Sequence, residues 1–177
     1  MYNIDDDSDG YRLVTGSPES FPSSMLDTYA ELLEKGGAVR VNKNLLSQAW
    51  RWSMVIHTAT NKLLAAGALK QTNVNEVYYC RVFGTEKASL TQKFNTSNYR
   101  FDLGYIVTDS DFRGRGYCDM IIGSLLEQSA LHGVLATTQD LKIKNKLQRN
   151  GFEHQGNEWE ADNGGRLSLY LRSARNK

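Results

Sequence analysis

The stretch that decides the expected fold is FDLGYIVTDSDFRGRGYCDMIIGSLLEQSALHG, residues 101–133. Its first eight residues alternate in character with the period of a β-strand and lead into the polar turn 109–111. A loop containing Gly114 and Gly116 comes next, and beyond it apolar side chains recur at helical spacing. The stretch therefore predicts a strand, a glycine loop and a helix in succession.

The glycine loop is a candidate anion site. A helix N terminus leaves backbone N–H groups without intrahelical partners and carries the positive end of the helix dipole. The two glycines would let the backbone approach an anion closely, and Arg113 and Arg115 would add charge-assisted hydrogen bonds to phosphate oxygens. A P-loop is excluded because no lysine is followed by Ser or Thr, and Asp119 stands where a dinucleotide fingerprint needs its third glycine. A pyrophosphate fits the pattern that remains.

Periodicity and turn formers predict the other elements around this unit. Toward the N terminus we expect a first strand at 11–15, helices from an N-cap at Ser23 or Ser24 to Gly36-Gly37 and over 44–50, and an antiparallel hairpin of strands 52–58 and 63–69. Toward the C terminus we expect a strand at 134–138, a helix at 141–149 and a terminal hairpin of strands 152–159 and 166–172.

Two segments lack clear periodicity. Residues 1–10 are acidic and are expected to form a mobile or edge segment, and residues 71–98, with a helical piece at 77–83, are expected to be an insertion between strands. No repeat or linker interrupts the chain. The order of elements predicts a single α/β domain over residues 1–177, with a mixed, largely antiparallel twisted sheet flanked by helices.

The charge balance disfavours several classes of partner. The 177 residues include 21 Lys plus Arg and 20 Asp plus Glu, so a net charge of +1 gives no field to hold nucleic acid or an anionic membrane. The acidic first residues do not form a secretory signal, and no apolar run is long enough to span a membrane. Cys80 and Cys118 are expected to be reduced thiols. We therefore expect a cytoplasmic protein without a membrane or nucleic-acid partner, and the sequence leaves its oligomeric state open, a homodimer included.

The loop also resembles a motif of one enzyme family. Arg113, Gly116 and Cys118 stand at the three defined positions of a pattern that reads Arg or Gln, two residues, Gly, one residue, then Gly or Ala. The first two positions match, and the third departs from the pattern with another small residue. The strand before the loop, the helix after it, the strand to Thr138 and the pair Gly151-Phe152 follow the family's order. Over about residues 50–172 the chain resembles the GNAT superfamily of acyl-CoA N-acyltransferases.

The resemblance implies an activity and a cosubstrate. It implies transfer of an acetyl group from acetyl-CoA directly to a primary amine of a protein or small molecule, with no metal. The strand 101–108 would splay from its neighbour and pair with the pantetheine arm, and the loop amides would hold the pyrophosphate. The implied cofactor-binding residues are Ile106, Val107, Thr108, Arg113, Gly114, Arg115, Gly116, Tyr117 and Cys118.

Candidate catalytic residues are fewer. A carboxylate can accept the proton of the ammonium, and Asp102 is the candidate, on the strand face shared with Gly104 and Ile106, where histone-modifying relatives carry a glutamate. The alternative interpretation of Asp102 is a solvated strand-edge carboxylate paired with Arg100. A strand amide near Ile106 would polarise the thioester carbonyl.

The general acid is left unassigned by the sequence. Many family members have a tyrosine four residues before the Gly of the Gly-Phe pair, where this chain has Leu147, and a family asparagine corresponds to Asp140. Tyr117 and Tyr105 are the remaining candidates. We expect His57 to be a packed or hydrogen-bonded side chain rather than a base.

Two other functions compete with the enzyme. One is a GNAT-fold module, weakly active or inactive, that binds CoA or a protein partner, which the missing tyrosine favours. The other is a nucleic-acid or partner-binding protein that uses the basic loop, which the near-zero net charge makes the least favoured.

Overall fold

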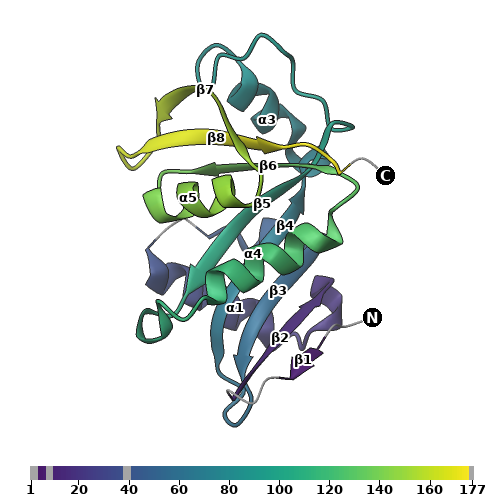
Figure 1. The fold of residues 1–177 in the computed structure, drawn as a ribbon, viewed down its shortest axis with the longest axis vertical. Coiled ribbons are helices and arrows are strands. Elements are labelled where there is room, and N and C mark those ends of the chain that lie inside the picture. The colour runs from purple at the N-terminus through teal and green to yellow at the C-terminus, as the bar shows by residue number, and fades with distance from the viewer. Residues whose placement is uncertain (1–3, 7–9, 38–40, 176–177) are drawn as a thin grey trace. The chain divides into compact units, whose positions relative to one another are not determined.

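The computed structural model describes residues 4–6, 10–37 and 41–175 (Figure 1). The chain packs as two compact units, one of residues 1–70 with 104–128 and one of residues 71–103 with 129–177. The strand β5 (Tyr99–Thr108) contributes its second half to the first unit and its first half to the second.

Among its described residues, the first unit contains four further strands and three α-helices. They are β1 (Ile4–Asp6), β2 (Tyr11–Gly16), α1 (Ser24–Gly36), α2 (Lys43–Ser47), β3 (Arg51–His57), β4 (Leu63–Gln71) and α4 (Tyr117–Gln128). The strands β1 to β4 pair antiparallel in chain order. The predicted hairpin of β3 and β4 and the predicted helix α4 are confirmed.

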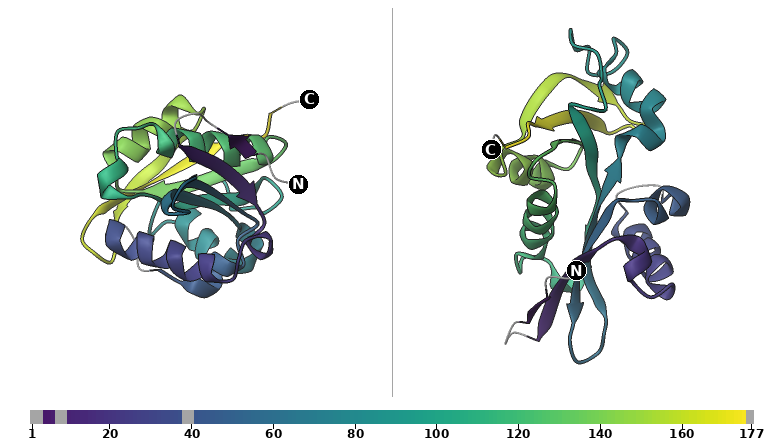
Figure 2. Two further views of the ribbon diagram at one scale, coloured as in Figure 1. Left: turned by 90° about the horizontal axis from the view of Figure 1, so that it is seen from below. Right: turned by 90° about the vertical axis from the view of Figure 1, so that its right-hand side faces the viewer.

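Both faces of β3 and β4 are covered in this unit. Figure 2 shows α1 and α4 on opposite faces of these strands. Because of this, residues 52–56 and 63–69 are buried without alternation, as in strands covered on both sides. On the α4 face the close approach requires Gly67, where a Cβ would come within 2.5 Å of the Ile121 side chain. On the α1 face, Tyr29, Leu33, Trp52 and Met54 belong to the buried core.

The second unit contains the rest of the sheet. Its elements are α3 (Glu76–Phe83), β6 (Gly133–Thr138), α5 (Leu141–Arg149), β7 (Glu153–Glu160) and β8 (Arg166–Arg172). β5 and β6 pair in parallel at Tyr99, Phe101 and Asp102, whereas β6 pairs antiparallel with β8, and β8 with β7. The strand order of the sheet is β1-β2-β3-β4-β5-β6-β8-β7. The predicted mixed, largely antiparallel sheet flanked by helices is confirmed.

The insertion between β4 and β5 packs on the second unit's sheet. It contributes α3, which confirms the predicted helical piece, and Tyr79, Val82, Phe83 and Phe94 join Trp159 in a buried cluster. A strand bulge holds the segment after α3. The register of β7 shifts between Gln155 and Trp159, and within the bulge Asn157 N–H donates to Ala88 C=O at 2.8 Å. The neighbouring Gly156 has φ +63°, and a Cβ there would overlap the same carbonyl oxygen.

The structure corrects the predicted N-terminal part. The predicted strand 11–15 is the second strand, because Ile4–Asp6 already forms an edge strand beside it, and residues 1–3 and 7–9 lie outside the described part. Ser23 occupies the N-cap of α1 without a side-chain capping bond. The helix predicted at 44–50 ends at Ser47, since Trp50 N–H already donates to Leu69 C=O at 2.8 Å and the chain has turned into the sheet. Across the described residues, no helix combines the length and the apolar character that crossing a membrane would take.

We expect Gly156→Ala to destabilise the protein by about 2 kcal/mol or more, because a side chain there is strained at positive φ and also overlaps Ala88. The matched control is Gly164→Ala in the β7–β8 turn, where φ is +77° but a Cβ meets no atom within 4 Å. Gly164→Ala should lower the free energy of unfolding by about 1 kcal/mol, from the backbone strain at positive φ alone. Urea denaturation measures both, and equal losses would contradict the close contact at Ala88.

Candidate functional site

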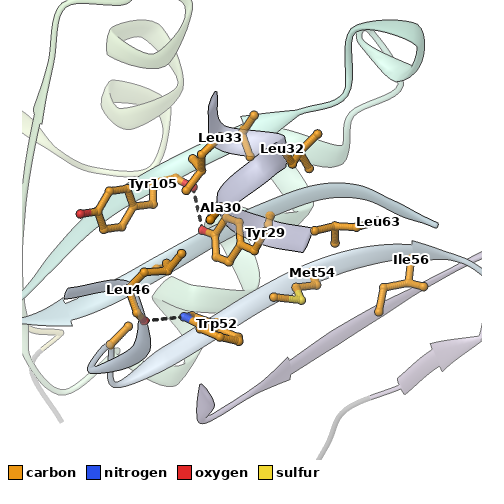
Figure 3. Close-up of a cluster of buried hydrophobic side chains, with 14 residues drawn as sticks. Tyr29, Ala30, Leu32, Leu33, Leu46, Trp52, Met54, Ile56, Leu63 and Tyr105 are labelled. Carbon is orange, nitrogen blue, oxygen red and sulfur yellow. Dashed lines mark hydrogen bonds between the residues drawn. The ribbon is translucent and has the colours of Figure 1, made fainter. Parts of the chain in front are cut away.

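The strand β5 is interrupted where the sequence predicts cofactor contacts. Tyr105 has φ +53°, a left-handed conformation that is uncommon for a residue with a side chain and costs free energy. The carbonyl oxygen of Tyr105 accepts a hydrogen bond from the Tyr29 hydroxyl of α1 at 2.7 Å in a fully buried environment. Figure 3 shows this bond among the side chains of the core. The core thus holds the backbone of β5 in an unusual conformation.

Tyr29 is held in its protonated form. Burial raises the pKa of its phenol well above the ordinary value, and the neighbouring Tyr105 raises it further. The ring lies edge-on to Trp52, with the ring centroids 5.7 Å apart. The Trp52 indole N–H donates in turn to Leu46 C=O at 3.0 Å. The raised pKa and the buried acceptor therefore keep Tyr29 a hydrogen-bond donor near neutral pH.

The loop after β5 is anchored to the β3–β4 hairpin. Asp109 N–H donates to Leu64 C=O at 2.8 Å, and the Asp109 carboxylate accepts from Asp111 N–H at 3.1 Å. The same carboxylate lies 2.9 Å from Lys62 Nζ. The hydrogen bond from Lys62 is the largest cause, and that from the Asp111 amide the next, of a lowered pKa at Asp109. These contacts fix where the glycine loop begins.

Two cations lie against one ring in this loop. Lys62 Nζ lies 4.8 Å from the centroid of the Phe112 ring, and the Arg115 guanidinium carbon lies 5.2 Å from it. Arg115 is exposed, as is Arg113. The loop therefore presents positive charge to solvent on a supported backbone.

The glycines of the loop have the geometry of an anion cradle. Gly114 and Gly116 have φ of +81° and +83°, and a Cβ on either would meet no atom within 4 Å. The carbonyl of Gly116 accepts from the amides of Asp119 and Met120, which opens α4 directly after the loop. Side chains at the two glycines would fill the space beside the first amides of the helix. These residues fit a phosphate group, and the predicted succession of strand, glycine loop and helix is confirmed.

The remaining predicted contacts contribute mainly backbone. The Tyr117 side chain is buried, with its ring 4.9 Å from that of Tyr11, and Val107 packs on the α1 side against Gly36. Ile106 and Thr108 are half-buried. Only the main-chain groups of Tyr117 and Val107 could therefore contact a cofactor. The buried Tyr117 side chain also gives no support to its predicted role as the general acid.

Asp102 is buried in the second unit. Its side chain is 4% exposed, and its carboxylate accepts a hydrogen bond from the Tyr79 hydroxyl at 2.7 Å. The interpretation as a solvated strand-edge carboxylate is wrong, because Asp102 is buried. The left-handed residue Tyr105 also interrupts the alternation that the sequence assigns to the face shared by Asp102 and Ile106.

Other sequence candidates have structural roles. Leu147 is fully buried in α5, and the Asp140 carboxylate caps that helix by accepting from the amides of Lys142 and Ile143. His57 Nδ1 lies 2.9 Å from the Thr60 hydroxyl, as expected for a hydrogen-bonded side chain. Within the described ranges no group of three or more His, Cys, Asp or Glu side chains could hold a metal ion.

Sequence reasoning missed the residues that support the site. The sequence pattern places Lys62 in a polar hairpin turn, and it places Tyr29 and Tyr79 at apolar positions of helices. Their partners are 47, 76 and 23 residues away, at Asp109, Tyr105 and Asp102. No local pattern carries such pairings.

Comparisons with solved structures agree with this geometry. An acyl-CoA N-acyltransferase from Pseudomonas aeruginosa superposes with a TM-score of 0.67 at 13% identity, covering 97% of this chain and 100% of that one. A GNAT-family acetyltransferase from Streptococcus agalactiae gives 0.64 at 18% identity, with 99% and 100% covered. A chain of the NatC complex bound to Gag peptide and CoA gives 0.66 at 9% identity, with 92% and 99% covered.

The chain has the GNAT fold. A scan of family models and a search of curated protein sequences return no match to it. The likeness therefore lies in the backbone and in the loop motif rather than in the sequence as a whole. In this GNAT-fold chain the left-handed strand residue and the glycine loop both belong to the first unit.

We expect Lys62→Gln to raise the pKa of the Asp109 carboxyl toward its ordinary value, because the largest cause of its lowering is lost. A carboxyl whose pKa is lower in the folded state than in the unfolded state stabilises the fold at any pH above its unfolded-state pKa. This contribution is lost as the pH falls through its folded-state pKa. The variant should thus be less stable than wild type by about 1 kcal/mol at neutral pH, with the difference vanishing in acid.

The matched control is Lys43→Gln, which removes an ion pair to Asp27 of 2.7 Å whose side chains are 51% and 66% exposed. Solvent screening should make its effect smaller. A ¹³C NMR titration of the carboxyls and denaturation at several pH values measure both variants. An unmoved Asp109 titration would contradict the anchoring role of Lys62.

Proposed function

We propose that this chain is an acetyl-CoA-dependent N-acetyltransferase that transfers the acetyl group directly to a primary amine of a protein or small molecule. The observation that carries the proposal is the cradle formed by Gly114 and Gly116, both left-handed and open, at the N terminus of α4. Two exposed arginines flank it. The GNAT fold of CoA-bound neighbours supports CoA as the ligand.

The chain's own groups would divide the work of binding. The first amides of α4 and Arg113 would hold the pyrophosphate, and main-chain groups of Ile106 and Thr108 would pair with the pantetheine arm. The acyl thioester supplies the acetyl group. The N–H of Ile106 would stabilise negative charge on the thioester oxygen as the amine attacks.

Proton transfer has one candidate acceptor. A primary amine must lose a proton before or during attack, and Asp102 remains our candidate to take it, with the Tyr79 hydroxyl as its hydrogen-bond partner. The new C–N bond forms as the C–S bond breaks. Leu147 offers no proton to the departing sulfur, so CoA would leave as the thiolate and take its proton from water.

A second candidate function is favoured by Leu147. Its full burial in α5 places an inert side chain where many family members have a tyrosine acid. A GNAT-fold module that binds CoA or a protein partner with weak or no turnover would need no such acid.

We also infer a cytoplasmic location, where acetyl-CoA is available to a soluble enzyme. Neither Cys80 nor Cys118 is in a disulfide bond, which fits a reducing compartment.

We expect Gly116→Glu to weaken binding of CoA at least ~10-fold, because the side chain fills the cradle and places negative charge beside the pyrophosphate. Isothermal titration calorimetry measures the affinity. The matched control is Gly123→Glu, which adds the same charge on the exposed face of α4 away from the loop and should bind CoA as wild type does. Equal affinity in Gly116→Glu and wild type would refute the cradle.

Thiol release from acetyl-CoA in the presence of pooled primary amines should separate the two functions. We expect amine-dependent release by the wild-type chain and none by Gly116→Glu, since the variant should not hold the cosubstrate. Saturable CoA binding without release would select the binding module. Mass spectrometry of the acetylated products then identifies the acceptor.

A further inference from the structure

The Tyr29 hydroxyl reaches one particular peptide group of β5. It donates to the carbonyl oxygen of Tyr105 at 2.7 Å, and neither residue is more than 9% exposed. A strand carbonyl in regular conformation points along the sheet toward a neighbouring strand. The Tyr105 carbonyl departs from this direction: Tyr105 has a left-handed φ, and its carbonyl oxygen meets the Tyr29 side chain of α1, which covers one face of the strands (Figure 3).

The direction of the carbonyl fixes that of the next amide. A trans peptide group is planar, with its C=O and N–H pointing in opposite directions, and no peptide bond among the described residues is cis. Because the Tyr105 carbonyl accepts from the Tyr29 hydroxyl of α1, the planar peptide directs the N–H of Ile106 away from α1.

We infer that Tyr29 is a positioning residue for acetyl transfer: its phenol orients and polarises the Tyr105–Ile106 peptide so that the Ile106 N–H stabilises the thioester oxygen. This inference rests on the proposed function and assigns it a residue that does not touch the substrate. The phenol acts through the peptide in two ways. It holds the amide in one direction before the substrate binds, and by accepting charge density from the carbonyl it makes the N–H a stronger donor.

The burial of Tyr29 suits this role. A fully buried hydroxyl without an acceptor would be costly, so the bond to Tyr105 is retained whether or not ligand is bound. The phenol also stays protonated, as its raised pKa requires. The strain of a left-handed tyrosine is offset by this bond and by the packing of the Tyr105 ring, with Lys70 Nζ 4.8 Å from its centroid.

The test is the carbonyl stretch of bound acetyl-CoA, read by isotope-edited infrared spectroscopy with a ¹³C label on the thioester carbon. Wild type should shift this band to lower frequency relative to free acetyl-CoA. Tyr29→Phe should bind acetyl-CoA within ~2-fold of wild type and show a smaller red shift, with kcat lowered ~10-fold, less than the 10²–10³-fold typical of losing the donor itself.

The matched control is Trp52→Phe. It removes another buried side-chain bond to a backbone carbonyl in the same cluster, from Trp52 Nε1 to Leu46 (Figure 3). Phenylalanine keeps an aromatic ring beside Tyr29, and the variant does not itself remove the bond from Tyr29 to Tyr105. It should lower stability but leave the red shift as in wild type. A second variant keeps the packing of Tyr29: 3-fluorotyrosine at position 29 has a more acidic hydroxyl and should increase the red shift.

The outcomes separate this inference from the proposed function. A red shift that is the same in wild type, Tyr29→Phe and the fluorotyrosine protein overturns the role of Tyr29 while the enzyme stands. If Tyr29→Phe does not fold, the fluorotyrosine protein alone decides. A wild-type chain that binds no acetyl-CoA overturns both.

Discussion

The hydrogen bond from Tyr29 to the Tyr105 carbonyl is the constraint on which the site depends. A left-handed tyrosine inside a strand is unfavourable by itself and persists only where its surroundings determine it. Here the helix α1 supplies both the acceptor's partner and a packed core around it. The hydrophobic core of the first unit thereby sets the direction of backbone groups on β5. Packing and chemistry are linked through a single peptide group.

The glycine loop depends on a second, separate set of contacts. The β3–β4 hairpin holds Asp109 through the carbonyl of Leu64 and the ammonium of Lys62, and α4 begins nine residues after the last residue of β5. The left-handed glycines then need no support from side chains of their own, because open space is what an anion requires. The backbone of β5 is thus held by α1. The glycine loop is held by the β3–β4 hairpin and by α4, which covers the face opposite α1 (Figure 2).

Local signals in the sequence were enough to predict most of the fold. The alternation of 101–108, the glycines and the helical spacing after them are all encoded within 33 residues, and the structure reproduces their order. Residues 1–10 were predicted only as a mobile or edge segment, without the strand Ile4–Asp6, and the bulge of β7 was missed. Both features depend on a partner strand rather than on composition. The residues that support the site escaped prediction for the same reason. Tyr29 and Tyr105 are 76 residues apart, and a tyrosine at a core position of a helix gives no sign of its acceptor.

Leu147 bears on the chemistry more than any other departure from the family pattern. A buried leucine cannot donate a proton, so in the proposed enzyme CoA would leave as a thiolate. A thiol has a pKa near 8.5, so its departure as a thiolate is only slightly unfavourable close to neutral pH. An amine has a pKa near 10 and cannot attack while it is protonated. The harder proton transfer is therefore the removal of the proton from the acceptor, and charge on the thioester oxygen is the other barrier. In the proposed mechanism the Asp102–Tyr79 pair would address the first and the Tyr29–Tyr105 pair the second. Loss of the family tyrosine consequently argues less against catalysis than loss of either of these pairs would.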